Sequence, residues 1–115
     1  MNIIKVKIGK HSYDIIVGLD IIKLLGEYVL KSNIGKDAYI ITNAKIKKRF
    51  GLNLKKTLYR AGISVKFKTI PDTEKSKSIE TAYSVIRDIS QYDKKRRIFI
   101  VAFGGGVIGD VSGFI

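Results

Sequence analysis

The stretch of sequence that decides the fold is Ile98-Phe99-Ile100-Val101-Ala102-Phe103-Gly104-Gly105-Gly106-Val107-Ile108-Gly109-Asp110. Its first six residues form the strongest apolar run of the chain, which predicts a buried strand over residues 98–103. The residues that follow have the spacing G-x-G-x-x-G, and they lie directly after this strand, where a helix is expected to begin near Gly106. A strand that turns through glycines into a helix is typical of a nucleotide-binding α/β fold.

The spacing of Gly104, Gly106 and Gly109 has a physical reason. Glycine lets the backbone turn sharply, and its missing Cβ lets the chain approach a pyrophosphate closely. The charge of that pyrophosphate is stabilised by the free amides and the positive dipole end of the helix. A tight, closely packed turn without any ligand would select the same glycines, so the spacing leaves both interpretations open.

The residues before this stretch alternate between strand and helix patterns. Apolar and charged side chains alternate over residues 3–8, and the alternation resumes at Tyr13, Ile15 and Val17 after the break at 9–11, which predicts a β-hairpin. Continuous apolar runs predict strands covered on both faces. The remaining expected elements are a helix over 21–32 capped by Asp20, a strand over 37–42, a helix over 44–61 ended by Gly62, and a strand over 63–70 ended by Pro71.

The next segment predicts a polar loop and one more helix. Residues 72–78 are polar, and from Ser78 the apolar side chains recur with the period of an amphipathic helix. That apolar stripe consists of Ile79, Ala82, Tyr83, Ile86 and Ile89. For the helix predicted over 44–61, a break near Gly51 stays open as an alternative to one continuous helix. Strands alternating with helices predict one Rossmann-like α/β domain, with a parallel sheet flanked by helices and an added amino-terminal hairpin.

A second polar cluster, formed by Asp72, Glu74, Lys75 and Lys77, follows the strand over 63–70. In an open α/β sheet, ligands bind outside the carboxyl ends of the strands, so this cluster and the glycine loop are expected on the same rim. A carboxylate there can accept hydrogen bonds from ribose hydroxyls, and a lysine can pair with a phosphate. A solvated turn that caps a helix is the alternative for these residues.

Composition narrows the classes of function. The chain has no cysteine and one histidine, His11, which excludes disulfides and makes a zinc site from these residues alone unattainable. It has no apolar run long enough for a membrane span and no signal peptide, so we expect a cytoplasmic protein without a membrane partner. The net charge is +12, but 17 lysines and 5 arginines are scattered over all segments, so we expect no nucleic-acid partner. The basic runs at 45–49 and 94–97 are interpreted as solvated faces.

Residues 71–81, Pro71-Asp72-Thr73-Glu74-Lys75-Ser76-Lys77-Ser78-Ile79-Glu80-Thr81, together with residues 104–114, resemble 3-dehydroquinate synthases of the shikimate pathway. The resemblance implies that Asp72, Glu74 and Lys77 belong to the family's NAD-contacting loop, in which Thr73 stands where glycine is usual. It implies that Asn43 lies near the adenosine. It further implies that a second group of residues contacts the pyrophosphate and the nicotinamide side of NAD. This group consists of Gly105, Gly106, Val107, Ile108, Gly109 and Asp110.

The same resemblance implies the chemistry of the family. Bound NAD transiently oxidises an alcohol of a heptulosonate phosphate (DAHP), phosphate is eliminated, and ring closure gives 3-dehydroquinate for aromatic amino acid biosynthesis. This phosphate-eliminating cyclase is a lyase that also needs zinc or cobalt, which acts as a Lewis acid. The resemblance implies that the metal ligands and most of the substrate site lie in a helical domain beyond Ile115, and no catalytic or metal-binding residue is expected within the chain.

Three other functions stay open. Another sugar-phosphate cyclase, forming an inosose or a valiolone, resembles this family through both loops. A glycerol or iron-dependent alcohol dehydrogenase has a related fold, although the continuation from Val107 to Phe114 would be unexpected there. The third alternative is a basic binding module without enzymatic activity.

The end of the sequence predicts a fragment. The expected last helix reaches Ile115 after less than two turns, with no cap and no following strand. We therefore expect the isolated chain to be inactive. It is also expected to form a homodimer or to self-associate otherwise, through the unpaired strand 98–103 and an apolar stub of Val111, Phe114 and Ile115.

Overall fold

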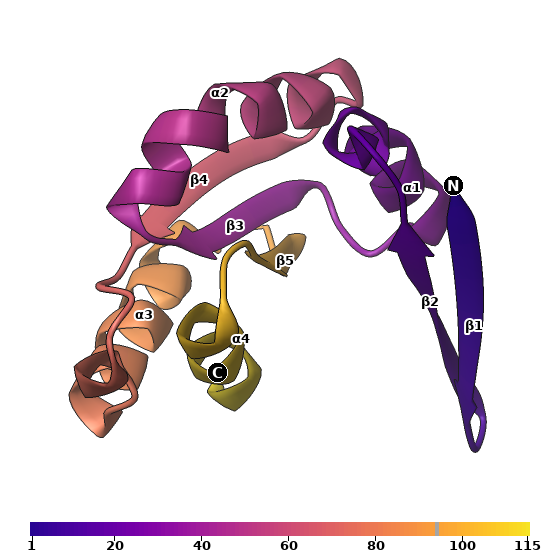
Figure 1. Cartoon of the computed structure of the whole chain (residues 1–115). Helices are drawn as coiled ribbons and strands as arrows, with labels where there is room; N and C mark the ends of the chain where they lie inside the picture. The colour runs from indigo at the N-terminus through magenta and orange to yellow at the C-terminus, as the bar shows by residue number, and fades with distance from the viewer. Residues whose placement is uncertain (94) are drawn as a thin grey trace.

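A computed structural model describes residues 1–93 and 95–115 of the chain (Figure 1). Of the basic run expected to be solvated at 94–97, Lys94 lies outside the described residues, and Lys95, Arg96 and Arg97 are exposed. Within the described part, no helix is both long and apolar enough to cross a membrane.

The structure confirms the predicted α/β architecture. A parallel sheet has β3 (Asp37–Thr42) at its centre, with β4 (Ser64–Thr69) on one side and β5 (Ile98–Ala102) on the other. Two helices, α1 (Leu25–Ser32) and α2 (Ala44–Arg60), cover one face, while α3 (Ile79–Tyr92) and α4 (Gly106–Phe114) cover the other (Figure 1). This arrangement brings the carboxyl ends of all three strands to one rim.

The central strand supplies both halves of the core. Ala38 and Ile40 pack with Leu54 and Leu58 of α2, whereas Tyr39 and Ile41 pack with residues of α3 and α4, because successive strand residues point to opposite faces. Residues 38–42 are fully buried. The structure therefore confirms that the continuous apolar run at 38–41 is a strand covered on both sides.

The hairpin is also confirmed. Strands β1 (Asn2–Ile8) and β2 (His11–Val17) pair antiparallel in a separate two-stranded sheet, and Gly9 adopts the left-handed conformation that the tight turn requires. The ribbon projects away from the three-stranded sheet (Figure 1).

One prediction about helix boundaries was wrong, and one alternative that the sequence left open is decided by the structure. Asp20 does not cap the first helix, because its φ of 52° is left-handed rather than extended, and its side chain makes no cap hydrogen bond. A short 3-10 helix, η1 (Ile21–Leu24), precedes α1 instead. The second helix is not interrupted at Gly51, where α2 continues and the backbone packs near the Phe67 ring of β4. Gly62 ends this helix as predicted, with a positive φ of 77°.

Two predictions of burial were also wrong. β5 is not the most buried strand, because it lies at the sheet edge, where Ile100 stays 40% exposed. Val111 is not part of an exposed apolar stub, since it is 4% exposed and packs in the core under α4. The predicted stripe of α3 is only partly correct. Its buried side chains are Ala82 and Val85, while Ile79, Tyr83 and Ile86 face solvent.

A polar network ties α3 to the sheet. The Tyr39 hydroxyl donates to Asp88 at 2.6 Å, and the Lys66 ammonium lies 3.2 Å from the other carboxylate oxygen. Burial, together with the Asp88 carboxylate, raises the pKa of the Tyr39 phenol well above its ordinary value. The hydrogen bond from Tyr39, with a further contribution from Lys66, lowers the pKa of the Asp88 carboxyl. The pair is therefore a neutral phenol bound to an ionised carboxylate.

This pair predicts a pH-dependent contribution to stability. We expect Tyr39→Phe to lower the free energy of unfolding by about 1.5–2 kcal/mol near neutral pH, because the hydrogen bond ends on a charged acceptor. Since the pKa of Asp88 is lowered in the folded state, its contribution is present above the unfolded pKa and is lost as the pH falls below about 4. Urea unfolding at neutral and acid pH measures both values. A deficit in the variant that stays constant in acid would contradict the assignment.

Candidate functional site

The polar residues singled out from the sequence meet at the carboxyl ends of the three parallel strands. Asn43 follows β3, residues 71–77 follow β4, and Gly104 and Gly105 lie between β5 and α4. Parallel strands place these loops side by side along one edge, so segments far apart in sequence form one rim.

Asn43 links the first two segments of the rim. Its side-chain oxygen accepts a hydrogen bond from the Ile46 amide at 2.8 Å, which caps α2. Its amide group donates to the Asp72 carboxylate at 3.3 Å. Because Asn43 is only 9% exposed, it fixes the position of the more exposed Asp72.

The loop after β4 is held by a residue that the sequence analysis did not select. Ser76 is 3% exposed, and its hydroxyl donates to the Pro71 carbonyl at 2.5 Å, which closes the loop around the short 3-10 helix η2 (Glu74–Ser76). A buried serine five residues after a proline gives no distinctive sequence signal. Thr73 stands where glycine is usual in the family that this loop resembles. Its backbone is extended, with φ of −134°, a conformation that any residue adopts.

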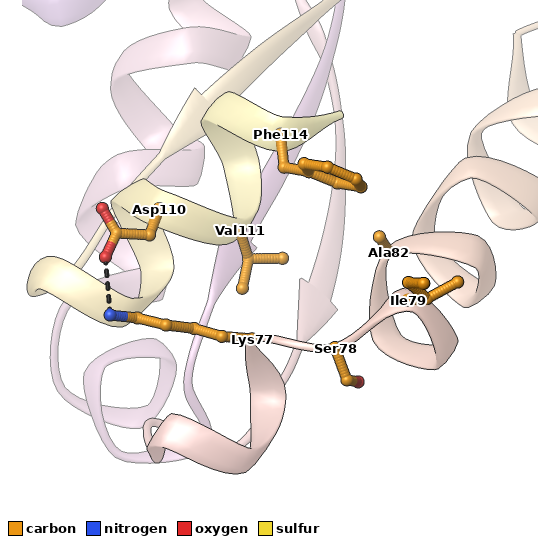
Figure 2. Close-up of a pocket in the computed structure, with 7 residues that line it drawn as sticks. All are labelled: Lys77, Ser78, Ile79, Ala82, Asp110, Val111 and Phe114. Atoms are coloured by element: carbon orange, nitrogen blue, oxygen red, sulfur yellow. Dashed lines mark ion pairs between the residues drawn. The ribbon is translucent and has the colours of Figure 1, made fainter.

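Lys77 links the second segment of the rim to the third. Its ammonium lies 2.8 Å from the Asp110 carboxylate of α4 (Figure 2), and 3.2 Å from the Glu74 carboxylate. Asp110, followed by Glu74, raises the pKa of the Lys77 ammonium above its ordinary value. All three side chains are at least partly exposed, so a ligand can exchange with either ion pair.

The glycines of the turn divide into two kinds. A Cβ on Gly104 would lie 2.8 Å from Cγ1 of the buried Ile108, so this position is required for packing of the turn. A Cβ on Gly105 would have only the Asp72 carboxylate in range, at 4.0 Å, and the space above Gly106 and Gly109 is open. The backbone at Gly105 is therefore accessible from the rim, directly at the amino end of α4.

Two cavities flank the rim. One has a volume of about 480 Å³, within the range of small-molecule sites, and is lined by Asn43, Ala44, Lys45, Thr69, Ile70, Pro71 and Asp72. The other, of about 240 Å³, is lined by Lys77, Ser78, Ile79, Ala82, Asp110, Val111 and Phe114 (Figure 2). Figure 2 shows Ile79 and Ala82 of α3 across the gap from Val111 and Phe114 of α4, with the Lys77–Asp110 pair at one end. The rim thus combines charged groups with apolar walls.

Not every candidate residue faces the rim with its side chain. Ile108 is fully buried in the core, so only its backbone is available to a ligand. Val107 is partly buried and packs against the same core. Lys75 is exposed, and among the described residues its side chain has no hydrogen bond or ion pair. In the same described part, no three His, Cys, Asp or Glu side chains cluster, so these residues do not fit a zinc or cobalt site.

Comparison with known proteins shows which family this rim resembles. Residues 67–115, which include both loops, match the family model 3-dehydroquinate synthase N-terminal. Over all 115 residues, the chain is 33% identical to the 3-dehydroquinate synthase of Thermodesulfovibrio yellowstonii and covers 32% of it. It is 36% identical to that of Pelotomaculum thermopropionicum, of which it covers 31%. The chain therefore spans about a third of the length of the curated relatives it matches.

Solved structures show the same fold. A 2-deoxy-scyllo-inosose synthase superposes with a TM-score of 0.83 at 16% identity, over 97% of this chain and 31% of that one. Another structure of that enzyme contains carbaglucose-6-phosphate, NAD+ and Co2+. A 2-epi-5-epi-valiolone synthase from Streptomyces hygroscopicus, with NAD+ and Zn2+ bound, superposes with a TM-score of 0.72 at 21% identity, over 94% of this chain and 29% of that one.

The sequence similarity extends over the whole chain, and the family match covers both loops of the rim. With the shared fold, these findings confirm the family resemblance recognised from the sequence. Residues 67–115 therefore match the amino-terminal domain model of the 3-dehydroquinate synthase family, and the full 115 residues are similar to members of that family.

Proposed function

We propose that residues 1–115 form the NAD-binding α/β domain of a 3-dehydroquinate synthase, which converts a heptulosonate phosphate to 3-dehydroquinate and phosphate. The observation that supports this most strongly is the rim itself. It joins three strand ends through Asn43–Asp72 and through Glu74–Lys77–Asp110, beside an open glycine backbone. Both relatives named above are 3-dehydroquinate synthases, which favours this substrate over those of the related cyclases.

NAD fits the residues of the rim. The open backbone at Gly105 and Gly106 admits a pyrophosphate, whose charge the amino end of α4 stabilises. Asp72 would accept hydrogen bonds from a ribose, and the larger cavity beside Asn43 would hold the adenosine. Lys77 and Asp110 would lie on the nicotinamide side, while Glu74, Lys75, Gly104, Val107, Ile108 and Gly109 complete the proposed contact set. When bound, NAD would supply a reversible hydride acceptor for oxidation of the substrate alcohol.

The proposal includes several further statements about the protein. The 115-residue chain alone is catalytically inactive, because the described residues do not fit a catalytic metal site, and the helical domain with the zinc or cobalt ligands lies outside it. The reaction is that of a lyase in a biosynthetic pathway, which favours a cytoplasmic location. Its partners are the small-molecule substrate and a second copy of the chain.

A nucleic-acid partner is not part of the proposal, although α2 concentrates positive charge. Seven lysines and arginines and no acidic residue lie within Ala44–Arg60, so the cations are less evenly scattered than the sequence suggested. Two of these seven are arginine, which is few for recognition of phosphate or base edges.

The direct test is phosphate release by the full-length protein that contains this domain. The heptulosonate phosphate is supplied to enzyme with NAD bound, and then to enzyme stripped of NAD. We expect release to stop without NAD and to return when NAD is added back, since elimination requires prior oxidation of the neighbouring alcohol. Phosphate release that is indifferent to NAD would exclude the proposed function.

A further inference from the structure

A polar cavity lies beside the carboxyl-terminal half of α2, between this helix and η1. Its volume is about 440 Å³, within the range of small-molecule sites. Since an α-helix rises about 1.5 Å per residue, Lys56 and Arg60 lie roughly 20–25 Å along α2 from Asn43 at the rim. Figure 1 shows that α2 runs away from the rim toward α1. The cavity, called the α2 cavity below, is therefore separate from the proposed NAD site.

The α2 cavity is lined mainly by positive charge. Lys23 of η1 lines it together with Lys56 and Arg60 of α2. One acidic residue, Asp20, also lines it. These three cations, called the lining cations below, and the one carboxylate give the lining a net charge of +2. A phosphomonoester carries a charge of about −1.5 to −2 near neutral pH, so its charge matches that of the lining.

The lining cations have no partner elsewhere in the described part of the chain. None of their side chains forms an ion pair or a hydrogen bond there, and none lies over an aromatic ring. Three other cations of α2, Lys47, Arg49 and Lys55, each lie over a ring. Because Lys56 and Arg60 have the spacing i, i+4, they share one side of the helix and repel each other. An anion bound between them would remove this repulsion.

A buried hydrogen bond fixes the two walls of the α2 cavity relative to each other. Thr57, which lines the cavity, is 8% exposed, and its hydroxyl donates to the Lys23 carbonyl at 2.8 Å. The backbone of η1 is thereby held against α2, with Lys23 on one wall and Lys56 and Arg60 on the other. A site whose backbone is already ordered loses less conformational entropy on binding.

The remaining lining residues indicate what the phosphate is attached to. Ile22 and Phe50 are partly buried apolar side chains, and Asn53 contributes an amide. An apolar wall favours a ligand that has an organic group, because both surfaces leave water on contact. We propose that the α2 cavity binds a small phosphomonoester, with its phosphate on the lining cations and an apolar group against Ile22 and Phe50. The planar guanidinium of Arg60 can bind two phosphate oxygens at once.

The first experiment titrates the isotope-labelled 115-residue chain with phenyl phosphate and, separately, with inorganic phosphate, while NMR follows each backbone amide. Because the lining cations are exposed, we expect weak binding of phenyl phosphate, with a dissociation constant on the order of 1 mM. We expect the largest shifts at residues 20–23 and 53–60, and at least about threefold weaker binding of inorganic phosphate. Since the rim is also proposed to hold phosphate, at Gly105 and Gly106, the residue-by-residue signal separates the two sites.

A second experiment compares two variants that each remove one positive charge from the carboxyl-terminal half of α2. Arg60→Gln removes a lining cation, whereas Lys55→Gln removes a cation that lies over the Tyr59 ring and does not line the cavity. We expect Arg60→Gln to weaken phenyl phosphate binding by at least about fivefold and Lys55→Gln by less than about twofold, because only Arg60 would contact the phosphate. Asp20→Asn should strengthen binding by about twofold or more, since it removes the carboxylate of the lining.

Equal losses in the two glutamine variants would overturn the inference, because α2 would then attract anions only through its overall charge, as a nucleic-acid surface does. Shifts confined to residues 104–106 would also overturn it, since they would place the phosphate at the rim. Equal affinities for phenyl phosphate and inorganic phosphate would leave the apolar wall without a role and exclude the proposed ligand. The absence of any shift at saturating phenyl phosphate would exclude the site.

Discussion

Replacing Gly105 with valine in the full-length protein is expected to weaken NAD binding by at least about a hundredfold, or roughly 2.7 kcal/mol, with little change in thermal stability. The backbone at Gly105 has φ of −83° and ψ of −163°, which any residue adopts, and only Asp72 lies within reach of an added Cβ. The valine side chain would therefore fill the space proposed for the pyrophosphate without disturbing the protein. Calorimetric titration with NAD and thermal unfolding of the same sample measure the two effects.

Gly104→Ala is the matched control. Its Cβ would lie 2.8 Å and 3.1 Å from two atoms of Ile108, so this variant is expected to lose stability first and affinity only as a consequence. Equal losses of affinity and stability in Gly105→Val would mean that Gly105 serves only the turn. Unchanged affinity in a stable Gly105→Val would place the pyrophosphate elsewhere.

The parts of the fold that follow from local patterns could be predicted from the sequence. The continuous apolar run at 38–41 indicated burial on both faces, and the structure places it in the central strand. The alternation over 3–8 indicated a two-sided ribbon, because one face of a strand differs from the other at a period of two. Gly62 was predicted to end a helix, and in the structure its positive φ lets the chain turn at that point.

The errors concern properties that depend on distant neighbours. The run at 98–103 is as apolar as a central strand, but strand order places β5 at the edge, and strand order is not encoded locally. Helix α3 is apolar on two sides, at Ala82 and Val85 and again at Ile79 and Tyr83, so periodicity alone could not decide which side is buried. Asp20 has the right residue type for a cap, but its left-handed backbone prevents that role.

For the candidate site, the sequence predicted which edge of the sheet the candidate residues share, but not the ion pairs that join them. That loops after parallel strands meet on one rim follows from topology, and it brought Asp72 and the glycine loop together as candidates, whereas Asn43 became a candidate through the family resemblance. The bridge from Lys77 to Asp110 joins residues 33 positions apart through side-chain geometry, which only the structure supplies. Whether these residues bind NAD remains the proposal that Gly105→Val tests.

The close contact between α1 and α2 depends on Gly26. An added Cβ there would lie 2.2 Å from the Thr57 carbonyl oxygen and 3.1 Å from the Ala61 side chain, so the two backbones touch at this point. The Gly26 amide donates to the Thr57 hydroxyl at 3.2 Å, and that hydroxyl donates to the Lys23 carbonyl at 2.8 Å. A larger residue at position 26 would have to separate the helices and break these hydrogen bonds.

We therefore expect Gly26→Ala to lower the free energy of unfolding by about 3 kcal/mol, the upper end for overpacking of a core. Gly113→Ala in α4 is the control, because its Cβ meets nothing within 4 Å and alanine favours a helix. That variant should gain stability, by up to about 0.5–1 kcal/mol. Thermal and urea unfolding of both variants give the comparison. If Gly26→Ala unfolds at the same temperature as the unchanged chain, α1 does not pack on α2 at the observed distance.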